Sequence, residues 1–374
     1  MTAKPNPPFD RLKPVSHGAF DYAELAGFGL EPEDVIDFSS SINPYGPASV
    51  VEQAARRADI DRYPDRDSNG LRNALAEHLE VDVSNIAVGN GSAELIDHLA
   101  RAYLAPSDTS LIVGPTFGEY ERAVRLCGAR TVFYNREISG GKVSLSLEEL
   151  LETVEREESR VVWLCNPNNP TGDYLRRGVI ERLLEAVVAV EGLLIVDEAY
   201  RDLMLWEEPD DLTGLLPGGN LALLRSMTKD HAIAGLRLGY VLAAPPAIRA
   251  LRVAAPPWNV GSPAQAAGIA ALSEGAAEHL RLSRDRMAHD AAYLRQKLEG
   301  LGLKVLPATA NFLLARVGDG AGLRRELLEK GLQVRDCASF DLPEYVRISV
   351  RRQEECRSLI STLKPLLEQK ESRL

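Results

Sequence analysis

Two neighbouring stretches decide how the fold and chemistry of this chain are interpreted: Arg225-Ser226-Met227-Thr228-Lys229 and Gly235-Leu236-Arg237-Leu238-Gly239. They follow the apolar run Leu221–Leu224, which is typical of a buried strand. A lysine cation is costly to bury at a strand end, but a Schiff base to an aldehyde cofactor would hold Lys229 there covalently. Arg237, between two glycines, could pair with a phosphate at close range. Such groups together would bind pyridoxal phosphate (PLP). Taken alone, however, the two stretches slightly favour the alternative of an ordinary strand end with a solvated lysine and arginine, and the other windows of the chain change that balance.

The composition is that of a soluble globular protein with room for one large or two medium domains: 374 residues, 45% hydrophobic and 26% charged. The formal net charge of −11 gives no electrostatic support for nucleic-acid binding, so an anionic ligand must meet a local cluster of cations. No run is as long as a membrane span, and Met1–Phe9 lacks the apolar stretch of a signal peptide. We therefore expect a cytoplasmic protein that binds neither membranes nor nucleic acids.

The cysteines and histidines indicate no metal site. The four cysteines are far apart and form no CxxC pair, and the six histidines are scattered without an HExxH pattern. A disulfide framework is equally unsupported, which agrees with a reducing compartment. The cysteines are Cys127, Cys165, Cys337 and Cys356.

Apolar runs of strand type alternate with amphipathic helical patterns from about residue 70 to 250. This alternation predicts a mostly parallel sheet with helices on both faces and ligands bound in the loops after the strands. The proline-rich stretch 256–263 marks a break. We expect an N-terminal arm (1–45) that joins a small α+β domain (261–374), and a large domain (46–260) between them.

The expected elements can be given by residue range. The strands are 110–113, 131–134, 160–164, 193–196, 221–224 and 240–243. The helices are 71–79, 94–104, 119–126, 146–157 and 179–190, with long helical patterns over 264–298. The helix at 146 begins with a capping-box sequence, Ser146-Leu147-Glu148-Glu149.

Polar residues follow two of the expected strands. Asp197, after the run Leu193–Val196, could keep the pyridine nitrogen of PLP protonated, which makes the ring an electron sink. Tyr200 could donate to the phenolic oxygen of the ring. In the loop Asn166–Gly172, two prolines and a glycine could hold an asparagine amide rigidly beside the ring. The alternative in each case is a polar turn without a ligand.

A glycine-rich segment, Gly89-Asn90-Gly91-Ser92-Ala93-Glu94, precedes an expected helix. Backbone N–H groups at a helix start form a ready phosphate site. The missing third glycine argues against a dinucleotide fingerprint, and no Walker A pattern is present. Phe117, in the segment Pro115–Tyr120, could stack on a flat cofactor, although an aromatic residue at a helix start is more often part of the core.

Taken together, these windows resemble a known family. GNGSAE, PTFGEY, NPNNPTG, DEAY and SMTK…GLRLG occur in the order found in fold type I PLP enzymes of the class I/II aminotransferase superfamily. The resemblance runs from His17 to about Leu363 and is strongest to histidinol-phosphate aminotransferases and threonine-phosphate decarboxylases. It implies an α/β fold: a large domain with a mostly parallel sheet in a helix–sheet–helix sandwich, and a small α+β domain.

The resemblance also implies roles for individual residues. Lys229 would form the Schiff base, Asp197 would pair with the pyridine nitrogen, and Asn169 and Tyr200 would contact the phenolic oxygen, with Phe117 stacked on the ring. We take Lys229, Asp197 and Tyr200 as the catalytic residues. The cofactor phosphate would be held by Arg237, Ser226 and the backbone of Ser92 and Ala93, with Thr228 nearby.

Three further residues have roles implied by the resemblance. Tyr63, in Arg62-Tyr63-Pro64, would reach the cofactor phosphate of a neighbouring subunit, which implies a homodimer with shared active sites. Arg347, in an alternating strand, would take the substrate carboxylate in a bidentate pair, and Arg335 would be a second anion contact. The alternatives are an ordinary turn tyrosine and exposed arginines of a half-buried strand.

The reaction is the open question, because it depends on which substrate bond lies perpendicular to the cofactor ring. The windows 16–18, 37–47, 310–314 and 335–340 look more like threonine-phosphate decarboxylases, with His17 and Asn43 as substrate contacts. We therefore expect a lyase that converts L-threonine O-3-phosphate to (R)-1-amino-2-propanol O-2-phosphate for cobalamin synthesis. The alternative is a histidinol-phosphate (or aromatic) aminotransferase that uses 2-oxoglutarate.

A different class of protein must also be weighed. PLP-fold domains occur in transcriptional regulators that bind the cofactor but react little. Those regulators carry an added DNA-binding domain, and this acidic chain has no room for one before residue 17. We therefore expect an enzyme.

Overall fold

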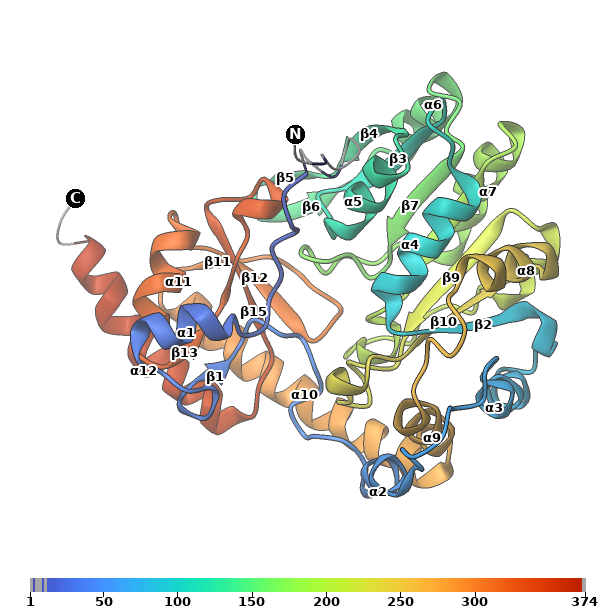
Figure 1. The fold of residues 1–374 in the computed structure, drawn as a ribbon. Coiled ribbons are helices and arrows are strands. Elements are labelled where there is room, and N and C mark those ends of the chain that lie inside the picture. The colour runs from blue at the N-terminus through green and yellow to red at the C-terminus, as the bar shows by residue number, and fades with distance from the viewer. Residues whose placement is uncertain (1–2, 4–8, 10–11, 372–374) are drawn as a thin grey trace.

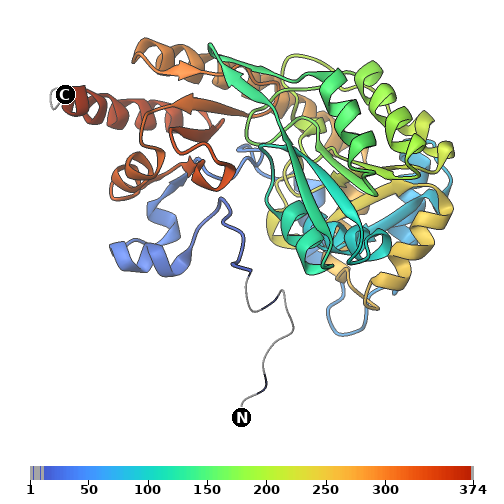
Figure 2. The same cartoon turned by 90° about the horizontal axis from the view of Figure 1, so that it is seen from above.

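The computed structural model describes residues 3, 9 and 12–371, so most of the Met1–Phe9 segment lies outside the described residues. The chain forms two units (Figure 1). One is built on a seven-stranded sheet, and the other on a four-stranded sheet. The view in Figure 2 shows the two units side by side, with the blue N-terminal arm beside the orange and red elements of the smaller unit.

The large sheet has the strand order β2-β10-β9-β8-β7-β3-β4. Every neighbouring pair is parallel except those of β10, which runs antiparallel to both β2 and β9. This mostly parallel sheet confirms the expected fold class. The strands are β2 (Ile86–Gly89), β3 (Thr109–Gly114), β4 (Arg130–Asn135), β7 (Val161–Cys165), β8 (Leu193–Asp197), β9 (Leu221–Ser226) and β10 (Gly239–Ala243).

Helices cover both faces of this sheet, which is why β7, β8 and β9 are buried along their whole length. Alternate strand residues pack against opposite layers. One layer contains α4 (Ser92–Tyr103), α5 (Glu119–Leu126) and α8 (Pro245–Ala254). The other contains α2 (Ser49–Arg57), α3 (Asn69–Leu79), α6 (Leu147–Arg156), α7 (Arg177–Ala189) and α9 (Ser262–Ala271).

The expected elements of the large unit are present, with ends shifted by a few residues. Strand β2 was not expected, because four residues ending in glycine give little strand signal. Ser146 caps α6 as its sequence predicts, with its hydroxyl accepting from the backbone N–H of Glu149. The sequence pattern also gave no sign of the short hairpin of β5 (Glu137–Ser139) and β6 (Lys142–Ser144).

The small unit has an antiparallel sheet of order β11-β12-β15-β14. Its strands are β11 (Lys304–Val305), β12 (Phe312–Arg316), β14 (Arg335–Asp336) and β15 (Tyr345–Ser349), and its helices are α10 (Glu274–Gly300), α11 (Gly320–Leu328) and α12 (Gln353–Glu371). The N-terminal arm packs against this unit. Its helix α1 (Tyr22–Phe28) precedes β1 (Ile36–Asp37), which pairs in parallel with β13 (Leu332–Gln333).

The long helical pattern over 264–298 is two helices in the structure, α9 and α10. Ser273 separates them and caps α10 by accepting from the backbone N–H of Ala276. Helix α9 packs on α2 and α3 of the large unit, whereas α10 contacts β11, β12 and α12 of the small one. We therefore propose that the large domain extends through α9 and that the small domain begins with α10.

Several kinds of feature are absent from the described residues. None of the helices there is long and apolar enough to cross a membrane. No group of His, Cys, Asp and Glu in the same residues could hold a metal ion. The four cysteines are free thiols.

Phe38 should anchor the arm. Its side chain is fully buried in the core of the small unit, while its backbone bonds Gln333 and Ser349. We expect Phe38→Ala to lower the free energy of unfolding by about 3–5 kcal/mol, because it leaves a cavity in that core. Urea unfolding measures the change. The control is Tyr22→Ala, at an exposed position of α1, whose free energy of unfolding should stay within about 0.5 kcal/mol of the parent. An equal loss of unfolding free energy in both variants would refute the proposed role of Phe38.

Candidate active site

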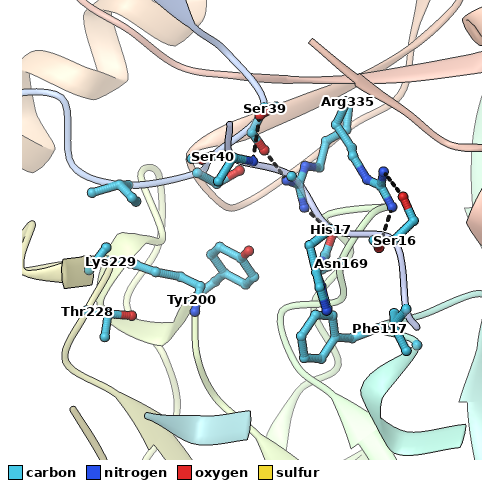
Figure 3. Close-up of a pocket in the computed structure, with 18 of the residues that line it drawn as sticks. Ser16, His17, Ser39, Ser40, Phe117, Asn169, Tyr200, Thr228, Lys229 and Arg335 are labelled. Carbon is cyan, nitrogen blue, oxygen red and sulfur yellow. Dashed lines mark hydrogen bonds between the residues drawn. The ribbon is translucent and has the colours of Figure 1, made fainter. Parts of the chain in front are cut away.

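A cavity of about 250 Å³ lies where the large sheet, the small unit and the arm meet. The loops after β7, β8 and β9 supply one wall of it, as expected for ligand sites at the carboxyl ends of parallel strands. The arm and the small unit supply the other walls (Figure 3). The lining includes His17, Phe117, Asn169, Tyr200, Thr228, Lys229, Arg237, Arg335 and Arg347.

Lys229 lies in the turn that follows β9. Its Nζ donates to Ser226 Oγ at 3.4 Å and lies 5.2 Å from the centroid of the Tyr200 ring, toward which it points in Figure 3. Asn43 holds this turn: its backbone N–H donates to the Lys229 carbonyl, and its side-chain amide donates to the Asp230 carbonyl at 3.1 Å. Asn43 is thus placed behind the lysine and not among the residues that line the cavity, where we had expected a substrate contact.

Asp197 is the last residue of β8 and is buried. Its carboxylate accepts from the Tyr120 hydroxyl at 2.6 Å and from the Ala199 N–H at 2.9 Å. No ion pair to it is formed within the described part of the chain. Burial raises the pKa of the Asp197 carboxyl, while the Tyr120 hydrogen bond and the charge of Lys229 act in the opposite direction. A buried carboxylate without a paired cation suits the protonated nitrogen of a pyridine ring.

A second corner of the site is shaped by two glycines. Gly91 has a φ of +79°, and a Cβ atom there would lie 2.8 Å from Arg237 Nη2. A Cβ on Gly239 would lie 3.0 Å from the backbone nitrogen of Ser92, the first residue of α4. Glycine at both positions therefore lets the arginine and the helix start approach each other closely.

The groups at this corner are hydrogen-bond donors that suit a phosphate. Ser92 and Ala93 form the first turn of α4, where backbone N–H groups have no partner within the helix. The hydroxyls of Ser226 and Thr228 lie 2.7 Å apart. Arg237 donates to the Ala234 carbonyl at 3.2 Å and has no carboxylate partner within the described ranges. With Lys229 and Asp197, this donor set fits PLP.

Phe117 and Asn169 line the cavity from two different loops. The Phe117 ring is 5.7 Å from that of Tyr120, in an edge-on arrangement. Asn169 is buried, and its side-chain oxygen accepts from an Nη atom of Arg347. Its loop is braced by Asn168, which donates to the Pro115 carbonyl at 2.9 Å.

Two arginines of the small unit face the cavity from neighbouring strands. Arg335 on β14 and Arg347 on β15 are opposite each other in the sheet register, so their side chains share one face. Both are buried, which excludes the alternative that they are ordinary exposed arginines. Burial lowers the pKa of Arg335, and although Asp336 opposes this, the neighbouring charge of Arg347 adds to it. Two adjacent buried cations favour an anionic ligand.

The arm closes part of the cavity through Ser16 and His17. Arg335 donates to the Ser16 hydroxyl and carbonyl at 3.0 and 2.8 Å (Figure 3). A hydrogen bond of 2.8 Å joins His17 Nε2 to Glu119 Oε1. Glu119 could not be predicted as a site residue from the sequence, because its partner is 102 residues away and no local pattern links the two.

Tyr63 lies apart from the cavity of its own chain. Its side chain is 77% exposed and stacks on Trp258, with ring centroids 4.7 Å apart. The structure therefore does not bring Tyr63 together with the other expected cofactor residues of its own chain.

The ends of β8 and β9 are joined by a buried ion pair that no sequence motif predicts. Glu198 Oε2 and Arg225 Nε are 2.7 Å apart. Glu198 directly follows Asp197, and Arg225 directly precedes Ser226. The only sequence signal was the presence of two opposite charges next to apolar runs.

Comparison with known proteins places this geometry in a family. Residues 33–363 match the model of the aminotransferase class I and II family. Histidinol-phosphate aminotransferase 1 of Thiobacillus denitrificans is 35% identical over 349 residues, 92% of this chain and 86% of that protein. Histidinol-phosphate aminotransferase 2 of Ralstonia nicotianae is 34% identical over 372 residues, 98% of this chain and 96% of that protein.

Solved structures share the fold. Histidinol-phosphate aminotransferase from Sinorhizobium meliloti, in complex with pyridoxal-5'-phosphate, has a TM-score of 0.87 at 24% identity, covering 99% of both chains. Aspartate aminotransferase from Thermus thermophilus with maleate has a TM-score of 0.81 at 23% identity, covering 92% of this chain and 94% of that one. The expected cofactor agrees with the family and with the ligand of the Sinorhizobium protein.

The expected reaction was wrong. The relatives at about 35% identity are histidinol-phosphate aminotransferases and not threonine-phosphate decarboxylases, so neither lyase chemistry nor a place in cobalamin synthesis is supported. The windows that favoured decarboxylation lie in the arm and the small unit, which supply walls of the cavity. They do not reveal which substrate bond is held perpendicular to the ring.

The family model matches residues 33–363, the relatives are similar over nine tenths of the chain, and a cavity surrounds Lys229. These three findings support the same family assignment. The chain belongs to the class I and II aminotransferase family.

Proposed function

We propose that this enzyme is a PLP-dependent histidinol-phosphate aminotransferase with 2-oxoglutarate as the amino acceptor. The observation that carries the proposal is the pairing of a lysine with two buried arginines, Arg335 and Arg347, in one cavity. Such a cavity suits an amino compound that has an anionic group away from the reacting carbon. The names of the relatives favour histidinol phosphate among such compounds.

Bound PLP supplies a ring that withdraws electrons from the reacting carbon of the substrate. Asp197 would hold the proton at the ring nitrogen, because its carboxylate is buried and forms no ion pair within the described residues. Asn169 and Tyr200 would donate to the phenolic oxygen, and Phe117 would stack on the ring. Ser226, Thr228 and Arg237 would hold the phosphate, together with the backbone N–H groups of Ser92 and Ala93.

Lys229 has two roles in this proposal. It would hold the cofactor covalently through a Schiff base, and its Nζ would take and return the proton at the reacting carbon of the substrate. The position of its Nζ near Ser226 and Tyr200 supports these roles. Asn43 stabilises that position, because its backbone N–H donates to the carbonyl of Lys229. The arm residues Ser16 and His17 limit the access of water to that amine.

The arginine pair serves both half-reactions. Histidinol phosphate has a phosphate group, and 2-oxoglutarate has two carboxylates, so each substrate presents an anion to Arg335 or Arg347. A guanidinium binds either group through two parallel hydrogen bonds. His17 lies at the mouth of the same cavity, 5.6 Å from the Phe117 ring, as a further substrate contact.

The enzyme is a cytoplasmic homodimer in this proposal, with Tyr63 of each subunit reaching the cofactor phosphate of the other. The surroundings of Tyr63 support an interface there. Ile60, three residues before Tyr63, and Trp258, which stacks on it, are exposed apolar residues, and grouped apolar residues at a surface mark contact sites.

Purified enzyme given histidinol phosphate and 2-oxoglutarate should form glutamate, which a coupled glutamate dehydrogenase assay measures. Threonine phosphate is the matched control, since it also combines an amine with a phosphate. We expect no release of carbon dioxide from it. Carbon dioxide release from threonine phosphate, without glutamate formation from histidinol phosphate, would refute the proposed reaction.

Lys229→Ala should lose the covalent adduct that borohydride traps between PLP and the wild-type enzyme. Turnover should fall by about 10²–10⁴-fold, because the group that moves the proton is missing. Mass spectrometry of the reduced protein detects the adduct. Lys142→Ala, at an exposed position of β6, is the control and should keep both properties. An adduct and full turnover in Lys229→Ala would show that another residue has this role.

Hybrid dimers test the shared site. Tyr63→Ala and Tyr63→Phe homodimers should bind PLP about tenfold more weakly, since each lacks a hydrogen bond to the phosphate. A hybrid of a Tyr63→Ala subunit with a Lys229→Ala subunit contains one complete site, with Tyr63 and Lys229 from different chains. The assay uses a PLP concentration that saturates the wild type and leaves the Tyr63→Ala homodimer largely empty, so that both parent homodimers are nearly inactive. Under this condition we expect the hybrid to recover about half of wild-type activity per dimer. A hybrid no more active than the mean of its two parent homodimers would contradict the sharing of sites.

A further inference from the structure

Glu119 is a buried carboxylate that has no part in the proposed binding of PLP. It is the first residue of α5, is only 8% exposed, and is not among the residues that line the cavity around Lys229. Its Oε1 atom is joined to Nε2 of His17 by the hydrogen bond of 2.8 Å. Through Glu119, the large unit thus holds a histidine of the arm that does line the cavity.

The Glu119 side chain is itself held from a second direction. Its Oε2 atom accepts from Arg122 at 3.1 Å, and the same nitrogen of Arg122 donates to Asp97 at 2.9 Å. Burial acts to raise the pKa of the Glu119 carboxyl, but the hydrogen bond from His17 and the charge of Arg122 outweigh it, so the pKa is lowered. The carboxyl is therefore ionised, and both of its oxygens have fixed partners.

The arm lies directly against its neighbours on both sides of this contact. A Cβ atom on Gly118 would lie 2.9 Å from Cγ1 of Val15, and a Cβ atom on Gly18 would lie 2.5 Å from the carbonyl oxygen of Ser39. Glycine at these two positions lets the segment that carries His17 approach α5 and the start of the small unit closely. The pairing of His17 with Glu119 is thus part of a close-packed arrangement.

One nitrogen of the His17 ring remains available to a ligand. Nδ1 has no hydrogen-bond partner among the described residues, and the side chain is 45% exposed. The preceding residue, Ser16, is held by Arg335, one of the two buried arginines of the same cavity (Figure 3). A histidine that donates through both ring nitrogens carries a positive charge, and the ionised Glu119 is the counter-ion for that form. An anion bound near Arg335 would then also meet the Nδ1–H group of His17.

We propose that Glu119 is a positioning residue for substrate recognition, which holds His17 as a cation at the mouth of the cavity so that its Nδ1–H group binds the phosphate of the substrate. The inference rests on the proposed function for the identity of that substrate, histidinol phosphate. Because Glu119 lies outside the cavity, it acts on the substrate only through His17. Loss of Glu119 should therefore weaken phosphate binding and leave the chemistry at the amine unchanged.

Kinetics of the PLP-loaded enzyme separate phosphate binding from chemistry. For Glu119→Gln we expect KM for histidinol phosphate to rise about tenfold and kcat to stay within about twofold, because a charged hydrogen bond is weakened while Lys229 is untouched. KM for histidinol, which lacks the phosphate, should not change. Glu121→Gln is the matched control: it removes a carboxylate of the same helix whose ion pair with Arg125 lies outside the cavity, and it should keep both KM values.

A double-mutant cycle tests whether Glu119 acts through His17. His17→Gln should raise KM for histidinol phosphate at least as much as Glu119→Gln does, and the double variant should lose no more than His17→Gln alone. Losses that add in the double variant would overturn the proposal, because Glu119 would then act by another route. An equal rise of KM for histidinol and for histidinol phosphate in Glu119→Gln would overturn it as well.

A measurement without turnover keeps the inference separate from the proposed reaction. In the PLP-loaded enzyme with ¹⁵N-labelled histidine, the resonance that is lost in His17→Gln should shift on titration with inorganic phosphate. Glu119→Gln should need about ten times more phosphate for the same shift. If this result is obtained with an enzyme that does not turn over histidinol phosphate, the proposed reaction fails and the role of Glu119 stands. A His17 resonance that ignores phosphate, or responds equally in Glu119→Gln, overturns the role of Glu119.

Glu119→Asp covers the case in which Glu119→Gln does not fold. It keeps the negative charge beside Arg122, but its side chain is shorter by one methylene group and should no longer reach Nε2 of His17. We expect the same increase, about tenfold, in the phosphate concentration needed to shift the His17 resonance. A wild-type response in folded Glu119→Asp would contradict the proposal.

Discussion

The buried ion pair between Glu198 and Arg225 is the interaction on which the active site depends. It joins the ends of β8 and β9, directly after Asp197 on one strand and four residues before Lys229 on the other. Removing one partner of such a pair leaves an uncompensated buried charge, at a cost of about 3–5 kcal/mol. The pair therefore fixes the distance between the two neighbouring loops. It thereby also fixes the relative positions of Asp197 and Lys229, the residues proposed to hold the ring nitrogen and the aldehyde of PLP.

The second requirement of the site is positive charge inside an acidic protein. The chain has a net charge of −11, yet Lys229, Arg237, Arg335 and Arg347 line one cavity. Cations held in a partly buried cleft act on an anion through a lower effective dielectric constant than exposed ones do. The acidic surface does not cancel the positive electrostatic potential of the cavity, because exposed charges more than about 10 Å away are screened by salt.

The fold was largely predictable, because its strands are continuous apolar runs and its helices have amphipathic patterns. Strand β2 was missed since it is short and ends in glycine, and the break at Ser273 was hidden within one helical pattern. The proposed cofactor residues that line the cavity could be suggested from the sequence, because they stand in recognisable windows at or after the ends of strands. The contacts of His17 with Glu119, of Asn43 with the Lys229 turn and of Tyr120 with Asp197 were not, since they join residues far apart in sequence.

The sequence by itself determined the alternation of strands and helices, the family, and the order of the residues that line the site. These are local properties: an apolar run, a turn with two glycines, a lysine after a strand. Only the tertiary structure decided that Arg335 and Arg347 lie side by side and buried, that Asn43 holds the lysine turn from behind, and that Tyr63 points away from the cavity of its own chain. Those placements depend on strand pairing and burial between distant segments. The stretch from Arg225 to Gly239 indicates the cofactor, but the walls that receive a substrate come from the arm and the small unit, which the fold alone brings to it.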